Sequence, residues 1–252
     1  MAEPKDAARG CVFCRAKPNS GEHVWPNWLR NIMPDRGKVR YHRSVQDLRT
    51  GLSAENDWPG RDYDLTVNCV CNACNTGWMS RLEDKAKPLL QSMAVGNGRD
   101  LYATGQRTVA AWTVLKAMMF NGKDRDDPIP AIHHRDLYAS RDDPRPPRDT
   151  QVWVGAHSLK GVDVQKHFAL TADRGGVAET NAYGTTFTVG HLVLQVFGHE
   201  VREGTKRNLT GTLAKTLTQV WPVSADKVVW PPELVMSPTD LSTVVNRSFV
   251  SG

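Results

Sequence analysis

The segment "CNACNTGWMSRLEDKAKPLL", residues 71–90, combines a pair of cysteines with the start of a helical pattern. Cys71 and Cys74 are separated by two residues, a spacing at which one tight turn aims both sulfur atoms at a single ion. Cys11 and Cys14, in "CVFC", repeat that spacing near the N-terminus. Four thiolates are the ligand set of a structural zinc site. The sequence therefore predicts one zinc ion held by both pairs, with no open coordination position for chemistry.

The remaining composition is that of an ordinary globular chain. Its 252 residues suffice for one large domain or two small ones. Five cysteines, an odd number, argue against a framework of disulfides. Cys69 is the cysteine outside the two pairs, and its alternation with Cys71 predicts a strand, with a small buried residue as the alternative. The polar start of the chain predicts a disordered tail over residues 1–10, no secretory signal and a cytoplasmic protein without a membrane partner.

Two helices are predicted from hydrophobic periodicity. One covers residues 76–93, where Pro88 should break or kink it because proline lacks the amide hydrogen. The other covers residues 104–120 and should turn Val109, Trp112 and Met119 inward. The charged, proline-rich stretch that follows, residues 123–149, is predicted to be loop, including His133 and His134, with a short helix around 134–140.

After residue 150 the sequence changes to short runs of β-branched and aromatic residues, which favour strands. The longest run should bend at a bulge at Gly190. The runs cover residues 150–157, 162–171, 185–199, 217–223 and 227–230. We therefore predict an α+β protein with a mainly antiparallel sheet and packed helices. Residues 11–95 would form the first domain, and residues 96–252 an α+β accessory domain for target choice, oligomerisation or regulation.

Between the cysteine pairs lies "SGEHVWPNW", residues 20–28. The order "CVFC…EHVWP…CNACN" resembles the HNH endonucleases, members of the ββα-metal class, over residues 11–84. The resemblance implies that residues 11–95 form a ββα-metal, zinc-bearing nuclease domain. It also implies that His23 is the general base, and that Glu22 and Asn75 bind a catalytic Mg²⁺ or Mn²⁺.

The chemistry of these side chains agrees with that implication. Cleavage of a phosphodiester needs an activated water and positive charge near the phosphate. Imidazole ordinarily titrates near pH 6.5, which suits a base at neutral pH, and the oxygen atoms of Glu22 and Asn75 suit Mg²⁺ or Mn²⁺. Plainer interpretations stay open: Glu22 and His23 could be ordinary surface residues, and Asn75 could cap a helix. Trp25 and Trp28 are expected in the core.

The sequence also departs from the family pattern. Glutamate stands where the family has aspartate or histidine, and the middle asparagine has no clean counterpart, Asn68 being the nearest. An insertion at residues 35–62, predicted to be a loop or a hairpin, lengthens the motif, and His42 within it is a candidate ligand or phosphate contact. Glu83 could brace the site or form a surface salt bridge.

The insertion is rich in basic residues, and the chain has a net charge of +5. Such a charge favours polyanionic partners. The predicted contacts to nucleic acid, with DNA the expected type, are Arg36, Lys38, Arg40 and Arg43. Two functions follow from the sequence: a metal-dependent endonuclease, or a non-catalytic zinc-stabilised module that binds nucleic acid or protein. Whether the chain forms a homo-oligomer is open.

Overall fold

The structure is a computed structural model. The residues it describes are 10–33, 37–47, 53–61, 64–122, 129–159, 165–173, 178–200, 209 and 211–247. Residues 1–9 of the predicted tail, which was to cover residues 1–10, lie outside these ranges, as does the predicted contact Arg36. None of the helices within the described ranges is long and apolar enough to span a membrane.

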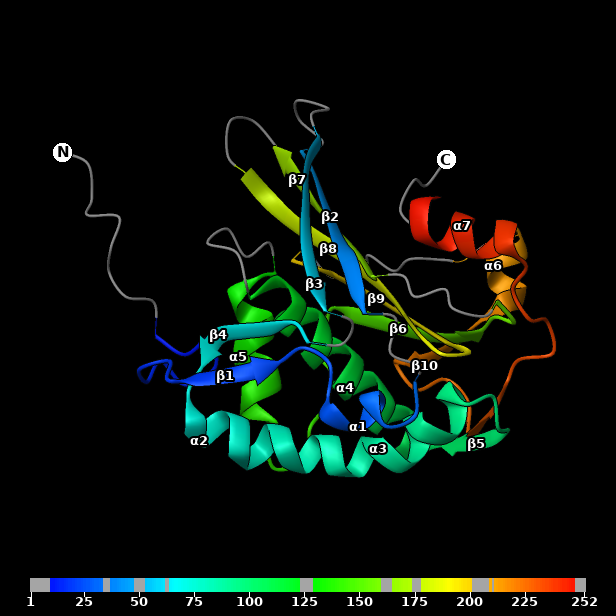
Figure 1. Cartoon of the computed structure of the whole chain (residues 1–252), viewed down its shortest axis with the longest axis horizontal. Coiled ribbons are helices and arrows are strands. Elements are labelled where there is room, and N and C mark those ends of the chain that lie inside the picture. Colours follow the sequence, from blue (N-terminus) through cyan, green and yellow to red (C-terminus); the bar gives the residue numbers. More distant parts are fainter. Residues whose placement is uncertain are drawn as a thin grey trace.

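The N-terminal part of the structure contains two short strands and a long helix (Figure 1). Strand β1 (Ser20–His23) pairs antiparallel with β4 (Thr66–Val70). After β4 the chain enters a helical segment made of α2 (Asn72–Cys74), η1 (Asn75–Met79) and α3 (Ser80–Ala94), with a kink at Gly77, whose backbone is not helical. The short helix α1 (Asn27–Arg30) follows β1; Trp25 just before it and Trp28 within it are buried, as predicted.

Pro88 does not end the helix, contrary to one of the predicted alternatives. Helix α3 continues through it to Ala94. The buried residues Leu82, Ala86, Leu90 and Met93 are spaced four, four and three positions apart, so they form one apolar stripe on both sides of the proline. Burial of this stripe stabilises the helix despite the missing amide hydrogen of Pro88.

A seven-stranded sheet forms the centre of the molecule, with the order β10-β6-β9-β8-β7-β2-β3. All neighbours are antiparallel except β2 and β7, which pair in parallel where Gln46 and Asp47 meet Leu170 and Thr171. The prediction of an α+β fold with antiparallel sheets is confirmed. The strands are β2 (Lys38–Asp47), β3 (Ser53–Arg61), β6 (Thr150–Ala156), β7 (Gln165–Asp173), β8 (Ala178–Val189), β9 (Leu192–His199) and β10 (Leu217–Trp221).

The insertion at residues 35–62 was predicted to be a loop or a hairpin, and it contains the hairpin β2–β3. This hairpin extends the sheet that is otherwise built from residues after 150 (Figure 1). The two predicted domains therefore share one sheet, and the boundary between residues 95 and 96 stays a prediction.

The run at residues 185–199 is not one bent strand. It contains the end of β8 and the whole of β9, joined by a tight turn at Gly190. Gly190 has a φ of +57°, and a Cβ atom there would lie 2.1 Å from the carbonyl oxygen of Ala94. Only glycine fits this turn, because it has no Cβ and adopts a positive φ without strain.

Two shorter strands stand apart from the large sheet. The predicted strand at residues 227–230 is β11 (Lys227–Trp230), and it pairs with β5 (Arg99–Tyr102) rather than with the seven strands.

Helices cover both faces of the large sheet. Alternate residues of a strand point to opposite faces, so Val152 and Val154 of β6 join the large core around α4 (Ala103–Asn121). Trp153 joins the smaller core beside α7 (Pro238–Arg247). The short helix α6 (Gly211–Thr216) lies next to α7.

Helix α4 confirms the predicted inward positions of Val109, Trp112 and Met119. However, every residue from 109 to 121 is buried, including Lys116. The reason is that α4 contacts α3 and α5 as well as strands β6, β9 and β10, so it has no solvent face over this length.

The histidines predicted to lie in a loop belong instead to helix α5 (Ala131–Ala139). His133 and His134 are both buried, and His133 Nδ1 lies 3.2 Å from the hydroxyl of Tyr183 on β8. The helix begins after Pro130, whose fixed φ favours a helix start. The short helix predicted around residues 134–140 is therefore present, but it begins three residues earlier, at Ala131, and so includes both histidines.

Burial lowers the pKa of His133 to about 4, more strongly than the charge of Asp149 raises it. The unfolded chain, with an ordinary histidine pKa, then binds more protons between pH 6.5 and 4. We therefore expect His133 to remove up to about 3 kcal/mol of stability as the pH falls through this range. Urea unfolding at pH 7 and pH 5 measures the loss, which the His133→Gln variant should reduce. An equal loss in the variant would contradict this assignment.

Candidate functional site

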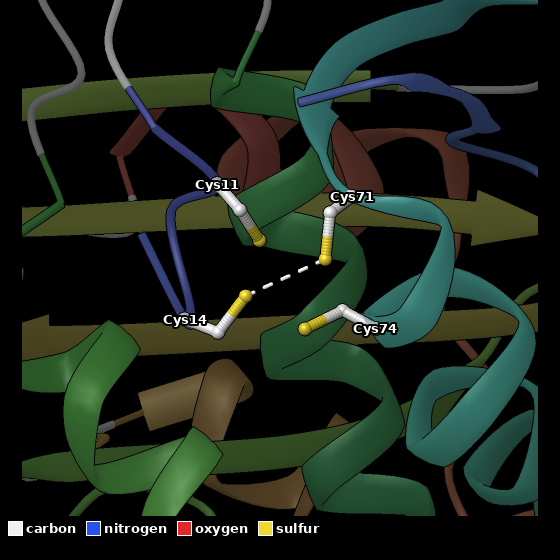
Figure 2. Close-up of side chains that lie close together, drawn as sticks. All are labelled: Cys11, Cys14, Cys71 and Cys74. Carbon is white, nitrogen blue, oxygen red and sulfur yellow. Dashed lines mark hydrogen bonds between the residues drawn. The ribbon is translucent and has the colours of Figure 1, made fainter. Parts of the chain in front are cut away.

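The four paired cysteines converge on one point (Figure 2). Their sulfur atoms all lie within 4.8 Å of one another, and the Sγ atoms of Cys14 and Cys71 are 3.4 Å apart. In a tetrahedral site with zinc–sulfur bonds of about 2.3 Å, the sulfur atoms would be about 3.8 Å apart. The cluster therefore fits a zinc ion, as the spacing of the cysteines predicts.

Backbone contacts hold the two halves of this cluster together. The amide of Val12 donates to the carbonyl of Cys69 at 3.0 Å, which joins the first cysteine pair to β4. The turn after Cys14 brings Arg15 to a φ of +67°, and a Cβ atom on Gly10 would lie 2.3 Å from the Arg15 carbonyl oxygen. Gly10 is thus required by close backbone approach. Cys69 is half-buried on β4, as its alternation predicts, and does not belong to the cluster.

The cysteine thiols differ in acidity before any metal is bound. Burial raises the pKa of Cys14 and of Cys74. Burial acts in the same direction on Cys71, but hydrogen bonds from the Cys74 backbone and from the neighbouring thiols leave the pKa of Cys71 lowered. Zinc must displace protons from these groups, so its binding should weaken in acid.

The pair Glu22–His23 lies on β1, and its two side chains point to opposite sides of the strand. A register shift between Ser20 and Glu22 marks a bulge in the β1–β4 pair, a feature often found beside functional sites. Glu22 is buried against the helices, whereas the side chain of His23 is 36% exposed. His23 is therefore accessible to water, and Glu22 is largely enclosed.

The carboxylate of Glu22 contacts a buried lysine. Lys116 Nζ of α4 lies 3.3 Å from Glu22 Oε1 and 3.1 Å from Glu83 Oε2 of α3. It also lies 3.4 Å from the carbonyl oxygen of His23. The side chain of Lys116 is fully buried, and its ammonium lies 5.7 Å from the centre of the Trp112 ring. Glu83 thus forms a salt bridge, one of its two predicted roles, although its partner is a buried lysine rather than a surface residue; the role as a brace stays a prediction.

The imidazole of His23 has a different neighbour. Its Nε2 atom lies 3.8 Å from Asp64 Oδ1, beyond hydrogen-bonding distance but close enough for electrostatic interaction. The guanidinium of Arg30 on α1 forms an ion pair with the same carboxylate. An exposed histidine, an aspartate and an arginine therefore lie together on the solvent side of β1.

Asn75 does not cap the helix, which corrects one of its predicted alternatives. The helical segment begins three residues earlier at Asn72, whose amide donates to Asn19 Oδ1 at 2.8 Å. Asn75 lies just before a kink at Gly77, whose φ and ψ are not helical. The side-chain amide nitrogen of Asn75 donates to Ser20 Oγ at 2.7 Å. The contact brings Asn75 beside β1.

Among the described residues, no hydrogen bond or ion pair joins the side chains of Glu22, His23 and Asn75 to one another. Their convergence on one ion stays a prediction. Asn68 is exposed on β4, and Lys38 is exposed at the start of β2. The side chains of Arg40, His42 and Arg43 lie outside the described part of the structure.

Sequence reasoning missed three of these residues. Lys116 is the one charged residue in the apolar run "TVLKAMMF", and that isolation is a detectable signal of a buried charge with a partner. Arg30 and Asp64 carry no comparable signal, because exposed charges are common in this part of the chain.

Comparisons with models of known protein families, with curated proteins and with solved structures found no match to this chain.

Proposed function

We propose that this chain is a metal-dependent endonuclease of the HNH type, which hydrolyses phosphodiester bonds in nucleic acid, with DNA the expected substrate. The observation that carries the proposal is the order strand β1, strand β4, helix α2–η1–α3 around the four cysteines. This order supports a ββα-metal unit. His23, the proposed base, lies half-exposed on the first of these strands.

In the proposed reaction His23 takes a proton from a water molecule. The oxygen of that water forms a new bond to phosphorus, the bond from phosphorus to the leaving oxygen breaks, and solvent protonates the leaving oxygen. Asp64 would stabilise the imidazolium that forms, since its carboxylate is 3.8 Å from Nε2. Arg30, paired with Asp64, would direct positive charge toward a phosphate.

Glu22 and Asn75 would hold a Mg²⁺ or Mn²⁺ ion, and their hard oxygen donors suit either metal. Lys116 contacts one carboxylate oxygen of Glu22, and the amide nitrogen of Asn75 is occupied by Ser20. The Asn75 amide oxygen is thus the donor left for an ion. When bound, the ion would stabilise the negative charge that develops on the phosphate and the leaving oxygen.

The exposed Lys38, with Arg36, Arg40 and Arg43, would contact the nucleic-acid backbone. Such contacts carry no sequence information, and they make binding weaker at high salt because bound counterions are released. Target choice would then belong to the accessory residues 96–252.

Conversion of supercoiled plasmid to nicked and linear forms in Mg²⁺, in Mn²⁺ and in EDTA tests the proposal. The zinc-loaded protein should cleave with either divalent ion and not in EDTA, with zinc content measured in every sample. Glu22→Gln and Asn75→Ala should lower the rate and raise the Mg²⁺ concentration needed for half-maximal cleavage. Absence of cleavage under all conditions, together with retained binding of nucleic acid, would indicate the non-catalytic module instead.

A further inference from the structure

Three charged groups from distant parts of the sequence meet in the core beside β1. Glu22 comes from the strand, Glu83 from α3 and Lys116 from α4. The ammonium of Lys116 has three N–H groups and three oxygen atoms around it, at 3.1, 3.3 and 3.4 Å. Since Lys116 is fully buried, its charge cannot turn to solvent, and the two carboxylates keep it in place.

The charges of this group do not cancel. Two carboxylates and one ammonium leave one net negative charge next to the backbone of His23. Lys116 donates a hydrogen bond to Oε1 of Glu22, so it orients the carboxylate and neutralises part of its charge. A lysine in this position should therefore weaken the attraction of Glu22 for a divalent ion, whereas Glu83 should strengthen it.

We propose that Lys116 is a positioning residue that, together with Glu83, sets how strongly Glu22 holds a divalent ion. This inference rests on the proposed function, in which Glu22 is a ligand of that ion. Helix α4 would thus supply a resident cation to the site from outside the residues that resemble the nuclease family. The Mg²⁺ or Mn²⁺ site would be kept weak, so that the ion exchanges with solution.

Calorimetric titration of the zinc-loaded full-length protein with Mn²⁺, without nucleic acid, tests the proposal. Lys116→Met removes the resident positive charge and should tighten Mn²⁺ binding by roughly tenfold or more. Glu83→Gln removes one negative charge and should weaken binding by a similar factor. The double variant should return close to the wild-type affinity, and Lys116→Arg, which keeps the charge, should also stay close to it.

Two controls identify the site and the cause. Glu22→Gln should abolish the Mn²⁺ binding that the other variants change. Lys87→Met removes an exposed lysine from α3 and should leave the affinity within threefold of wild type. A purely structural lysine would shift the melting temperature, but it would not give opposite effects for Lys116→Met and Glu83→Gln.

Equal Mn²⁺ affinities in wild type, Lys116→Met and Glu83→Gln would overturn the inference, as would a lack of binding in all three. If Lys116→Met does not fold, the other two variants decide. Weaker Mn²⁺ binding in Glu83→Gln, with unchanged binding in Lys116→Arg, supports the inference. Unchanged Mn²⁺ binding in Glu83→Gln overturns it. Because cleavage is not the readout, the two proposals fail separately. A protein that shows the expected order of affinities and cleaves nothing refutes the nuclease and keeps the role of Lys116.

Discussion

Cys74→Ser should release the zinc ion and unfold the part of the chain that surrounds β1, β4 and the start of the long helix. Cys74 is buried, and its sulfur lies within 4.8 Å of the other three. Zinc bound by four thiolates contributes its binding energy directly to folding, about 10–16 kcal/mol in small zinc-binding peptides. A hydroxyl is a poor replacement for a thiolate, so most of this stabilisation should be lost.

Elemental analysis and thermal unfolding measure this effect. Wild type should contain about one zinc per chain, the number that one four-thiolate cluster holds, and Cys74→Ser should contain almost none and melt at a much lower temperature. Cys69→Ser is the matched control, because Cys69 lies on β4 in the same unit but outside the cluster. Full zinc content and an unchanged melting temperature in Cys74→Ser would contradict the zinc site.

His23→Ala should slow cleavage of nucleic acid by a factor of about 10² to 10⁴, the usual cost of losing a general base. The side chain of His23 is half-exposed and contacts Asp64 rather than the core. Its removal should therefore leave zinc content and melting temperature unchanged. Single-turnover rates at saturating Mn²⁺ give the comparison. A variant that retains its fold and zinc and cleaves at the wild-type rate would show that His23 is not the base.

Local chemistry explains which features were predictable from the sequence. The four-cysteine cluster was predictable because each pair of cysteines needs only a two-residue gap to form half of it. Helix α4 was predictable from its apolar periodicity, and the strands after residue 150 from their β-branched residues. Each of these signals lies within one short segment of the chain.

The features that were not predictable depend on contacts between distant segments. The hairpin β2–β3 joins the large sheet where Gln46 and Asp47 of β2 pair with β7, more than 120 positions later. Lys116 meets Glu22 across 94 positions. No periodicity within either segment indicates such a partner, because the geometry of the whole fold brings them together.

The direction of the side chains in the candidate site was also not predictable from the sequence. That Glu22 and His23 are adjacent suggested a shared role, but neighbouring residues of a strand point to opposite faces. Glu22 accordingly contacts the buried Lys116, while His23 contacts the exposed Asp64. A sequence motif gives the order of such residues and not the direction of each side chain.

The most direct test of the proposed endonuclease is a side-by-side plasmid assay of the zinc-loaded wild type and His23→Ala in Mn²⁺. We predict that wild type converts supercoiled plasmid to nicked and then linear DNA, and that His23→Ala leaves it supercoiled over the same time. Equal cleavage by both proteins would show that nicking comes from another residue or from a contaminant. No cleavage by either protein would contradict the nuclease and leave the zinc-stabilised binding module.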